Sequence, residues 1–192
     1  MKNTIIYLIG FAGTGKFTIA QEIAKLTNSR VIDNQLVNNP ILSVMDPGND
    51  SPLPDQVWAK IRQIRQIVLE AIDALASPEE NFIFTNELIE GSAADEQIFS
   101  QIAELAQRRQ STFLPVRLEC AEEELCRRVI FENRKERLKD TNSKNTQEKY
   151  KKFTVLRPKT HTYLTLEVTH LSAEQAAHII LDHVHLTSKP PL

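Results

Sequence analysis

Residues 10–18 carry the residue types of a phosphate-binding loop. The stretch reads Gly10-Phe11-Ala12-Gly13-Thr14-Gly15-Lys16-Phe17-Thr18, and it matches the P-loop pattern G-x-x-x-x-G-K-[ST] except at the last position of the pattern. Glycines let the backbone curl around a phosphate, the N–H groups of a following helix bind its oxygens, and the lysine adds a mobile cation. We therefore predict a nucleotide site whose binding residues are Gly10, Ala12, Gly13, Thr14, Gly15, Lys16, Phe17 and Thr18.

Phe17 is the position where the loop departs from the pattern. The missing hydroxyl normally ligates the Mg²⁺ that bridges the β- and γ-phosphates of a nucleotide. Thr18 points about 100° further round the helix, so we expect it to hydrogen-bond an α- or β-phosphate oxygen rather than to replace the metal ligand. A dinucleotide-binding G-x-G-x-x-G motif does not fit, because the segment that begins at Gly13 ends in Thr18 instead of glycine.

Two carboxylates follow strand-like runs and are candidates for chemistry beside the loop. Asp33 closes the run that begins at Arg30, and it can orient an attacking hydroxyl, accept its proton or hold Mg²⁺ through water. The alternative is that Asp33 only caps a turn with Asn34. Glu87 follows the run 82–85 and is the second candidate, since without a hydroxyl at position 17 a Mg²⁺ ion would depend more heavily on carboxylates and water.

Arginines gather after the fourth strand-like run. Arg127, Arg134 and Arg137 are spaced by seven and three residues and would share one face of a helix that runs on into a charged segment. Arginines brought over a transferring phosphoryl group would neutralise its developing charge and exclude water. The alternative is a solvated basic face that pairs with the neighbouring glutamates.

Strand-like runs alternate with helical patterns along the whole chain, which predicts an α/β fold with a parallel sheet and helices on both faces. The strands are expected over 4–9, 30–33, 82–85, 113–119 and 163–168. The helices are expected after Lys16, from Asp55 as N-cap to Leu75, over about 93–109, from 121 to about 139, and after a capping box formed by Ser172 and Gln175. Because ligands of such sheets bind at the carboxyl ends of the strands, the loop, Asp33 and Glu87 should meet at one edge.

Three local features interrupt this alternation. Residues 34–54 contain four prolines and one glycine and are predicted to be irregular. Residues 134–152 are mostly charged or polar, which predicts a mobile flap or an exposed helix. Pro115 lies in the fourth run and should mark the start of a strand or an irregular edge position.

Composition and charge argue against several classes of protein. The 192 residues are the length of one ordinary domain, and the net charge of −2 gives no support for a dedicated nucleic-acid or membrane-surface protein. No apolar run reaches membrane-spanning length, and the first residues lead straight into the first strand, so we expect no signal peptide. The expectation is a cytoplasmic single domain over 1–187 with a disordered tail over 188–192, a monomer or homodimer whose partner is a small molecule.

These features together resemble the small P-loop kinases of the nucleoside monophosphate kinase and shikimate kinase superfamily. The resemblance is greatest to the bacterial AAA-type ATP-binding, shikimate-kinase-like group, which includes antibiotic-phosphotransferase-like members. It rests on the loop, Asp33, Glu87 and the segment Leu125-Cys126-Arg127-Arg128. It implies a three-layer P-loop NTPase fold with a five-stranded parallel sheet in the order 2-3-1-4-5, and ATP and Mg²⁺ as cofactors.

The same resemblance assigns roles to individual segments. It implies a substrate-binding segment over 34–54 and an arginine-bearing lid over 134–152. It also implies that Arg128 stacks on adenine beside the loop 169–173, and that Arg134 and Arg137 are the lid arginines. The chain departs from the family at Phe17, and its sequence shows no recognisable Gly-Gly and arginine set of the kind with which shikimate kinases hold their carboxylate substrate.

The predicted function is therefore an ATP-dependent kinase that transfers the γ-phosphate to a small hydroxylated or phosphorylated metabolite. Its predicted catalytic residues are Lys16, Asp33, Arg134 and Arg137, and its predicted Mg²⁺ holders, through water, are Asp33 and Glu87. One alternative is a nucleotide-binding regulatory or sensor protein that Phe17 has deprived of efficient transfer. Another is a nucleic-acid-end kinase, which the charge balance disfavours.

Overall fold

A five-stranded parallel sheet forms the centre of the protein. The computed structural model describes residues 1–45, 53–131, 134, 138, 141–160 and 162–187. The strands are β1 (Thr4–Ile9), β2 (Arg30–Asp33), β3 (Phe82–Asn86), β4 (Thr112–Glu119) and β5 (Leu164–Glu167). They lie in the order β2-β3-β1-β4-β5, so the predicted fold class and strand order are confirmed.

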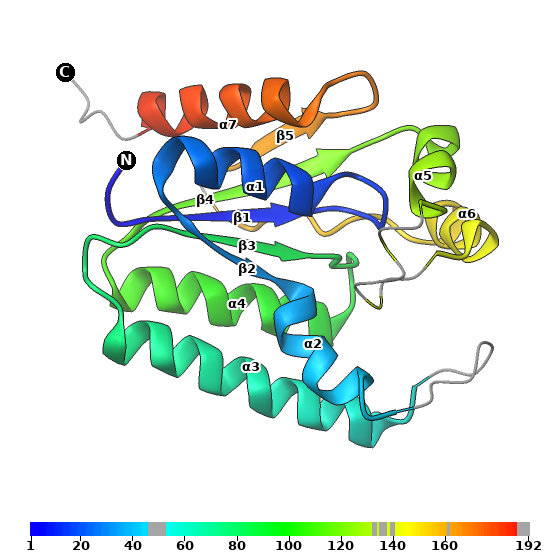
Figure 1. Ribbon diagram of the computed structural model, residues 1–192, viewed down its shortest axis with the longest axis horizontal. Coiled ribbons are helices and arrows are strands. Elements are labelled where there is room, and N and C mark those ends of the chain that lie inside the picture. Colours follow the sequence, from blue (N-terminus) through cyan, green and yellow to red (C-terminus); the bar gives the residue numbers. More distant parts are fainter. Residues whose placement is uncertain (46–52, 132–133, 135–137, 139–140, 161, 188–192) are drawn as a thin grey trace.

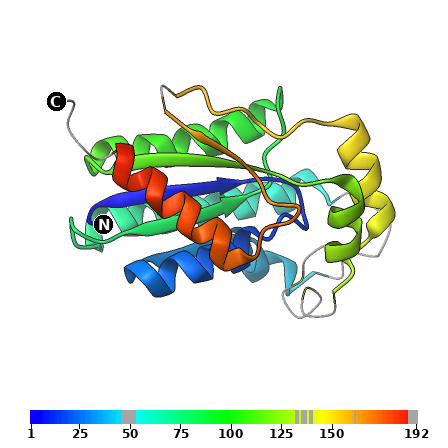
Figure 2. The ribbon, with the colours of Figure 1, turned by 90° about the horizontal axis from the view of Figure 1, so that it is seen from above.

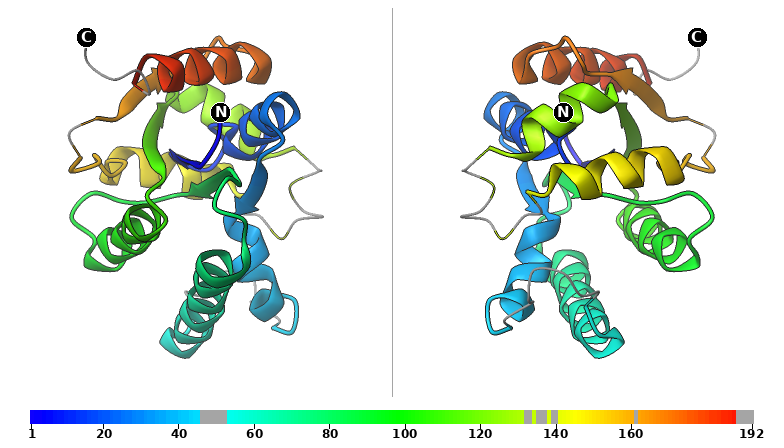
Figure 3. Two further views of the ribbon diagram at one scale, coloured as in Figure 1. Left: turned by 90° about the vertical axis from the view of Figure 1, so that its left-hand side faces the viewer. Right: turned by 90° about the vertical axis from the view of Figure 1, so that its right-hand side faces the viewer.

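Helices cover both faces of the sheet, and shorter helices lie near the carboxyl ends of its strands. One face carries α1 (Lys16–Thr27) and α7 (Ala173–Thr187), and the other carries α3 (Asp55–Leu75) and α4 (Ala93–Arg108) (Figure 1). Three shorter helices lie near the carboxyl ends of the strands: α2 (Asn34–Leu42), α5 (Glu122–Val129) and α6 (Ser143–Lys152). Figure 2 shows α5 and α6 side by side at that end, and the right-hand view of Figure 3 looks directly at them.

Strand β1 is the most deeply buried element because it has a neighbour on each side and helices on both faces. All six of its residues are buried, as expected for a parallel strand with an unbroken apolar run. Its last residue, Ile9, pairs with Asn86 of β3 and with Arg117 of β4, and Asp33 of β2 pairs with Thr85. The register therefore brings the loop, Asp33 and Glu87 to one edge, as predicted.

The prediction that residues 34–54 are irregular is wrong for their first part. Helix α2 occupies Asn34–Leu42 and keeps Pro40 inside it. A proline removes one helical hydrogen bond, but packing on α3 compensates for the loss, because Val37 of α2 is buried with Val57 and Ile61 of α3. Residues 46–52 lie outside the described residues, so the rest of the predicted substrate-binding segment is only partly described.

The helix predicted from 121 to about 139 is also wrong in its length. Helix α5 ends at Val129 with Ile130 as its C-cap. Ile130 and Phe131 are both exposed, so the apolar stripe that holds α5 on the protein does not continue at the two residues after Val129. Arg137 lies outside the described residues, as does the predicted tail over 188–192.

The polar segment before Phe153 forms an exposed helix, which was one of the two alternatives predicted for it. Asn142 caps α6, since its side chain accepts hydrogen bonds from the N–H groups of Lys144 and Asn145. Among the residues of α6, only Thr146 is buried. The helix therefore adds no apolar side chain to the buried core.

Three smaller predictions concern single residues. Asp55 is the first residue of α3 and follows Pro54 as N-cap, so its predicted capping role is wrong. Pro115 lies inside β4, not at its start, but at a point where only β1 is a neighbour, because β5 pairs with β4 from Val116 onward. The capping box is confirmed by reciprocal hydrogen bonds of 2.9 Å and 3.1 Å between Ser172 and Gln175.

Within the described ranges, no helix combines the length and apolar character needed to cross a membrane.

Candidate active site

The loop between β1 and α1 has the backbone that its glycines predict. Gly13 and Gly15 have φ values of +89° and +84°, a region that residues with a Cβ rarely adopt. Gly13 also lies against α5, because a Cβ there would come within 2.9 Å of the Leu125 carbonyl oxygen. Helix α1 starts at Lys16 with no side-chain cap from Gly15. Its first N–H groups can therefore bind an anion at the loop.

Lys16 folds back onto this loop. Its Nζ donates to the carbonyl oxygens of Gly10 and Phe11 at 2.6 Å and 2.8 Å, and lies 3.4 Å from Thr14 Oγ1. The ammonium group therefore sits within the ring of the loop. A phosphate bound by the same loop would meet this cation directly.

A cavity of about 1120 Å³ opens at the carboxyl edge of the sheet. The predicted site residues on its wall are Ala12, Gly13, Gly15, Lys16, Phe17, Thr18, Asp33, Glu87 and Arg134. Gly10, Thr14 and Arg128 do not line it, as far as the described residues show. The cavity thus brings together most of the predicted site, from four separate segments of the chain.

Asp33 is buried at the end of β2 and faces this cavity. It is 3 % exposed, and its Oδ1 accepts a hydrogen bond of 2.5 Å from Thr85 Oγ1. Although Asp33 is the N-cap residue of α2, its side chain makes no cap hydrogen bond. The alternative that it serves only as a cap is therefore wrong, and its carboxylate is oriented by the neighbouring strand instead.

Glu87 contacts both the loop and α6. Its Oε2 accepts the N–H of Ala12 at 2.8 Å, and its Oε1 pairs with Lys149 Nζ at 3.0 Å. The structure therefore places Glu87 beside the loop and on the cavity wall, while its role as a metal holder stays a prediction.

The far wall of the cavity contains residues that the sequence analysis missed. Helix α3 presents Trp58, Ile61, Arg62 and Arg65 to the cavity, at the spacing of one helical face. Arg65 is only 8 % exposed, and it makes no hydrogen bond or ion pair with any residue that the structure describes. Burial lowers the pKa of its guanidinium, an effect that Tyr7 and Asp95 partly oppose. The spacing of Arg62 and Arg65 was the available signal.

Two amides of α2 add hydrogen-bonding capacity to the same region. Gln35 and Asn38 both line the cavity. Their side-chain oxygens, Gln35 Oε1 and Asn38 Oδ1, are buried and have no hydrogen-bond partner within the described part of the chain. Buried polar atoms of this kind are usually satisfied by water or a ligand. This part of the cavity therefore suits a ligand with hydroxyl groups and a negative charge.

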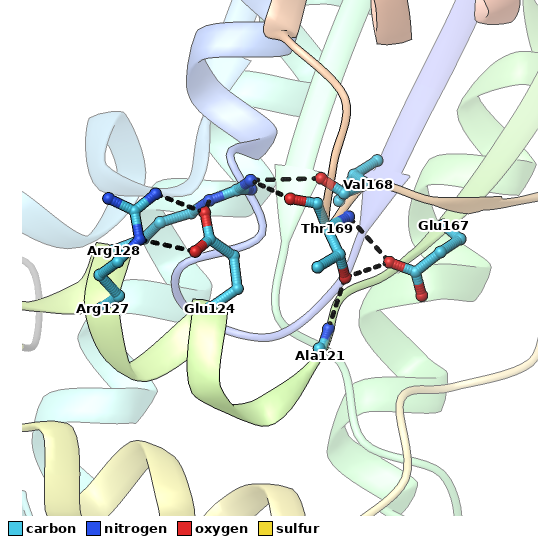
Figure 4. Close-up of polar contacts among 7 residues, drawn as sticks. All are labelled: Ala121, Glu124, Arg127, Arg128, Glu167, Val168 and Thr169. Carbon is cyan, nitrogen blue, oxygen red and sulfur yellow. Dashed lines mark hydrogen bonds and ion pairs between the residues drawn. The ribbon is translucent and has the colours of Figure 1, made fainter.

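Arg128 joins α5 to the segment that follows β5 (Figure 4). Its Nε donates to Glu124 at 2.5 Å, and its Nη2 donates to the carbonyl oxygens of Val168 and Thr169 at 3.2 Å and 3.0 Å. The predicted adenine-stacking arginine and the start of the predicted adenine loop are therefore adjacent, while stacking itself stays a prediction. Arg127 also pairs with Glu124. For this arginine, the contact agrees with the alternative of a solvated basic face that pairs with neighbouring glutamates, rather than with a place over a phosphoryl group.

The pKa of Glu124 gives a prediction for acid stability. Hydrogen bonds from Arg127 and then from Arg128 hold this pKa at about 2, below its ordinary value of 4.5. A lowered folded-state pKa stabilises the protein above about pH 4.5, and this contribution is lost as the pH falls toward about 2. We expect Glu124→Gln to flatten the fall of the melting temperature in this window. Thermal melts across that pH range measure it, with the exposed Glu123→Gln as control, and parallel profiles for wild type and Glu124→Gln would contradict it.

A magnesium ion would find few protein ligands here. Across the described ranges, no group of three or more His, Cys, Asp or Glu side chains could hold a metal ion. Mg²⁺ bound with a nucleotide needs only one or two carboxylates, with phosphates and waters as its other ligands. Asp33 and Glu87 on the cavity wall fit that smaller requirement, whereas Phe17 offers no ligand atom.

Comparison with known proteins supports the fold. No model of a protein family matches the sequence, and a search of curated proteins finds no match. Solved structures do match over nearly their whole length. The shikimate kinase of Acinetobacter baumannii is 17 % identical with a TM-score of 0.56, and covers 97 % of this chain and 96 % of its own.

Two further solved structures are similar. The gluconokinase of Sinorhizobium meliloti is 14 % identical with a TM-score of 0.56, and covers 97 % of this chain and 98 % of its own. The tunicamycin resistance protein of Deinococcus radiodurans is 19 % identical with a TM-score of 0.61, and covers 98 % of this chain and 99 % of its own. At these identities the likeness shows the fold, which is that of the P-loop small-molecule kinases.

Proposed function

We propose that this protein is a phosphotransferase that moves the γ-phosphate of ATP to a hydroxyl group of a small metabolite. The observation that carries the proposal is the single cavity that has Lys16, Asp33 and Arg134 on its wall. Its volume of about 1120 Å³ exceeds the range of roughly 300–1,000 Å³ typical of one small-molecule site. There is therefore room for a nucleotide and an acceptor together.

Each residue has a role that follows from its place. The N–H groups of the loop and Lys16 bind the β- and γ-phosphates, and Arg134 neutralises charge on the transferring group. Asp33, oriented by Thr85, accepts the proton of the acceptor hydroxyl while that oxygen bonds to the γ-phosphorus. The bond from this phosphorus to the β,γ-bridging oxygen breaks, and ADP leaves. Asp33 and Glu87, both on the cavity wall, would hold Mg²⁺ through water, and the ion would supply screening of the phosphate charges.

The acceptor is proposed to carry a negative charge as well as hydroxyl groups. Arg65 is a buried cation that makes no hydrogen bond or ion pair among the described residues, and the exposed Arg62 lies one turn before it on the same wall. A carboxylate or phosphate on the acceptor would satisfy such a cation by paired hydrogen bonds. The amide oxygens of Gln35 and Asn38, which have no hydrogen-bond partner among the residues that the structure describes, would accept hydrogen bonds from its hydroxyl groups.

The test combines nucleotide binding, turnover and the residue at position 17. ATP should raise the melting temperature, and more so with Mg²⁺, because a ligand of the native state stabilises it. ADP should form from ATP only when an acceptor from a panel of hydroxylated acids and sugar phosphates is present. Phe17→Ser should lower the Mg²⁺ concentration that gives half-maximal turnover, because it restores a metal ligand.

Two results would count against the proposal. Absence of any ATP-induced stabilisation would refute the nucleotide site. Tight ATP binding without turnover, in wild type and in Phe17→Ser across the whole panel, would favour the nucleotide sensor instead.

A further inference from the structure

Glu87 uses a hydrogen-bond donor that the loop would otherwise offer to a phosphate. Its Oε2 lies 2.8 Å from the backbone nitrogen of Ala12, and Ala12 lies in the phosphate-binding loop and on the cavity wall. Loops of this type bind anions through just such backbone N–H groups. In this structure, an internal carboxylate therefore acts as an anion for the loop.

The second oxygen of Glu87 holds a cation from α6. Lys149 Nζ lies 3.0 Å from Glu87 Oε1, and Lys149 lines the same cavity as Lys16 and Arg134. The side chains of Lys149 and Glu87 are 43 % and 24 % exposed. Both are therefore within reach of a ligand that enters the cavity from solvent.

Helix α6 holds Lys149 in place through contacts on both sides of it. Glu122 of α5 accepts a hydrogen bond of 2.8 Å from Gln147 and lies 3.6 Å from Lys151 Nζ. The ring of Tyr150 packs against Phe11 of the loop, with 5.8 Å between the ring centroids. Helix α6 is thus anchored at Gln147, Tyr150 and Lys151, which lie on both sides of Lys149 in the sequence. These contacts keep the ammonium group of Lys149 near the loop.

We propose that Lys149 is a further phosphate-binding residue of this site, and that Glu87 is the positioning residue that keeps it at the loop until a phosphate arrives. A nucleotide phosphate takes over both partners of the carboxylate, the Ala12 N–H and the Lys149 ammonium group. No donor is left unpaired by this exchange, and the Glu87 carboxylate can turn toward solvent. The inference rests on the proposed function, because it assigns a phosphate to this cavity.

The inference and a metal-holding role for Glu87 predict different changes in the affinity for phosphate compounds when the carboxylate is removed. If the carboxylate competes with phosphate, its removal strengthens the binding of phosphate compounds even without metal. If it holds Mg²⁺, its removal weakens binding only when Mg²⁺ is present. If it merely supports the loop, its removal weakens binding under both conditions.

The experiment measures the affinity for pyrophosphate and ADP by calorimetry in EDTA. Glu87→Gln keeps an amide oxygen for the Ala12 N–H and should bind both compounds about fivefold more tightly, the order expected for a partly exposed charge pair. Lys149→Gln should bind them about fivefold more weakly for the same reason. Lys144→Gln, at an exposed position of the same helix and off the cavity wall, is the matched control and should match wild type. Melting temperatures of the variants without ligand show that they fold.

Each contrary result has a definite reading. Weaker or unchanged binding by Glu87→Gln in EDTA, or unchanged binding by Lys149→Gln, overturns the inference. Binding that changes as expected, in a protein that turns over no acceptor, supports Lys149 and Glu87 while the proposed transferase activity fails. No binding of either compound by folded wild type overturns both.

Discussion

Replacing Lys16 by alanine is expected to lower ATP turnover by about a thousandfold, the order observed when one donor aimed at developing negative charge is removed. Lys16 Nζ already lies within the loop, bound to the carbonyl oxygens of Gly10 and Phe11. No other side chain of the loop carries a positive charge, so alanine leaves the loop itself without a cation for the phosphates. The measurement is the initial rate of ADP formation, together with the ATP-induced shift in melting temperature.

Lys25→Ala is the matched control for this variant. Lys25 lies on the same helix, is exposed and pairs with Glu22, so its loss should leave both measurements unchanged. Undiminished ATP affinity and turnover in Lys16→Ala would remove the loop from the proposed site.

Asp33→Asn is expected to lower kcat by about 10²- to 10⁴-fold, the range for loss of a general base. Asparagine keeps an oxygen that can accept the 2.5 Å hydrogen bond of Thr85 but cannot take a proton from the acceptor. The KM for ATP should change little, because the loop that binds the phosphates is intact. Steady-state kinetics with both substrates varied separate these two effects.

Asp182→Asn, at an exposed position on α7, provides the control for Asp33→Asn. A variant at position 33 with full kcat would show that Asp33 is not the base. A rise in the Mg²⁺ requirement with only a small loss of kcat would assign Asp33 to the metal instead.

Much of the fold was predictable because the signals for it are local. The six residues of β1 form one unbroken apolar run followed directly by glycine, so both the strand and the loop could be read from neighbouring residues. The same holds for the capping box of Ser172 and Gln175. Helix α2 was not predictable in this way, because Pro40 is a strong local signal and the packing of Val37 on α3 is a long-range contact.

The candidate site was predictable where a strand end places a residue beside the loop, as for Asp33 and Glu87. It was not predictable where one residue lies far away in sequence. The ion pair between Glu87 and Lys149 spans 62 positions, and nothing in the composition of 134–152 distinguishes Lys149 from its neighbouring lysines. Arg65 was missed for a different reason. Its helix face is largely apolar and packs on other elements, as Val57 and Leu69 do, and only the structure shows that part of this face borders a cavity.

The shortness of the outer strands has a consequence for the behaviour of the protein in concentrated solution. The two edge strands, β2 and β5, have four residues each. An exposed strand edge is a template on which another chain can add a strand, and short edges offer few unpaired N–H and C=O groups for such pairing. Aggregation by sheet extension should therefore be limited for the folded protein, which favours the high protein concentrations that calorimetry and crystallisation require.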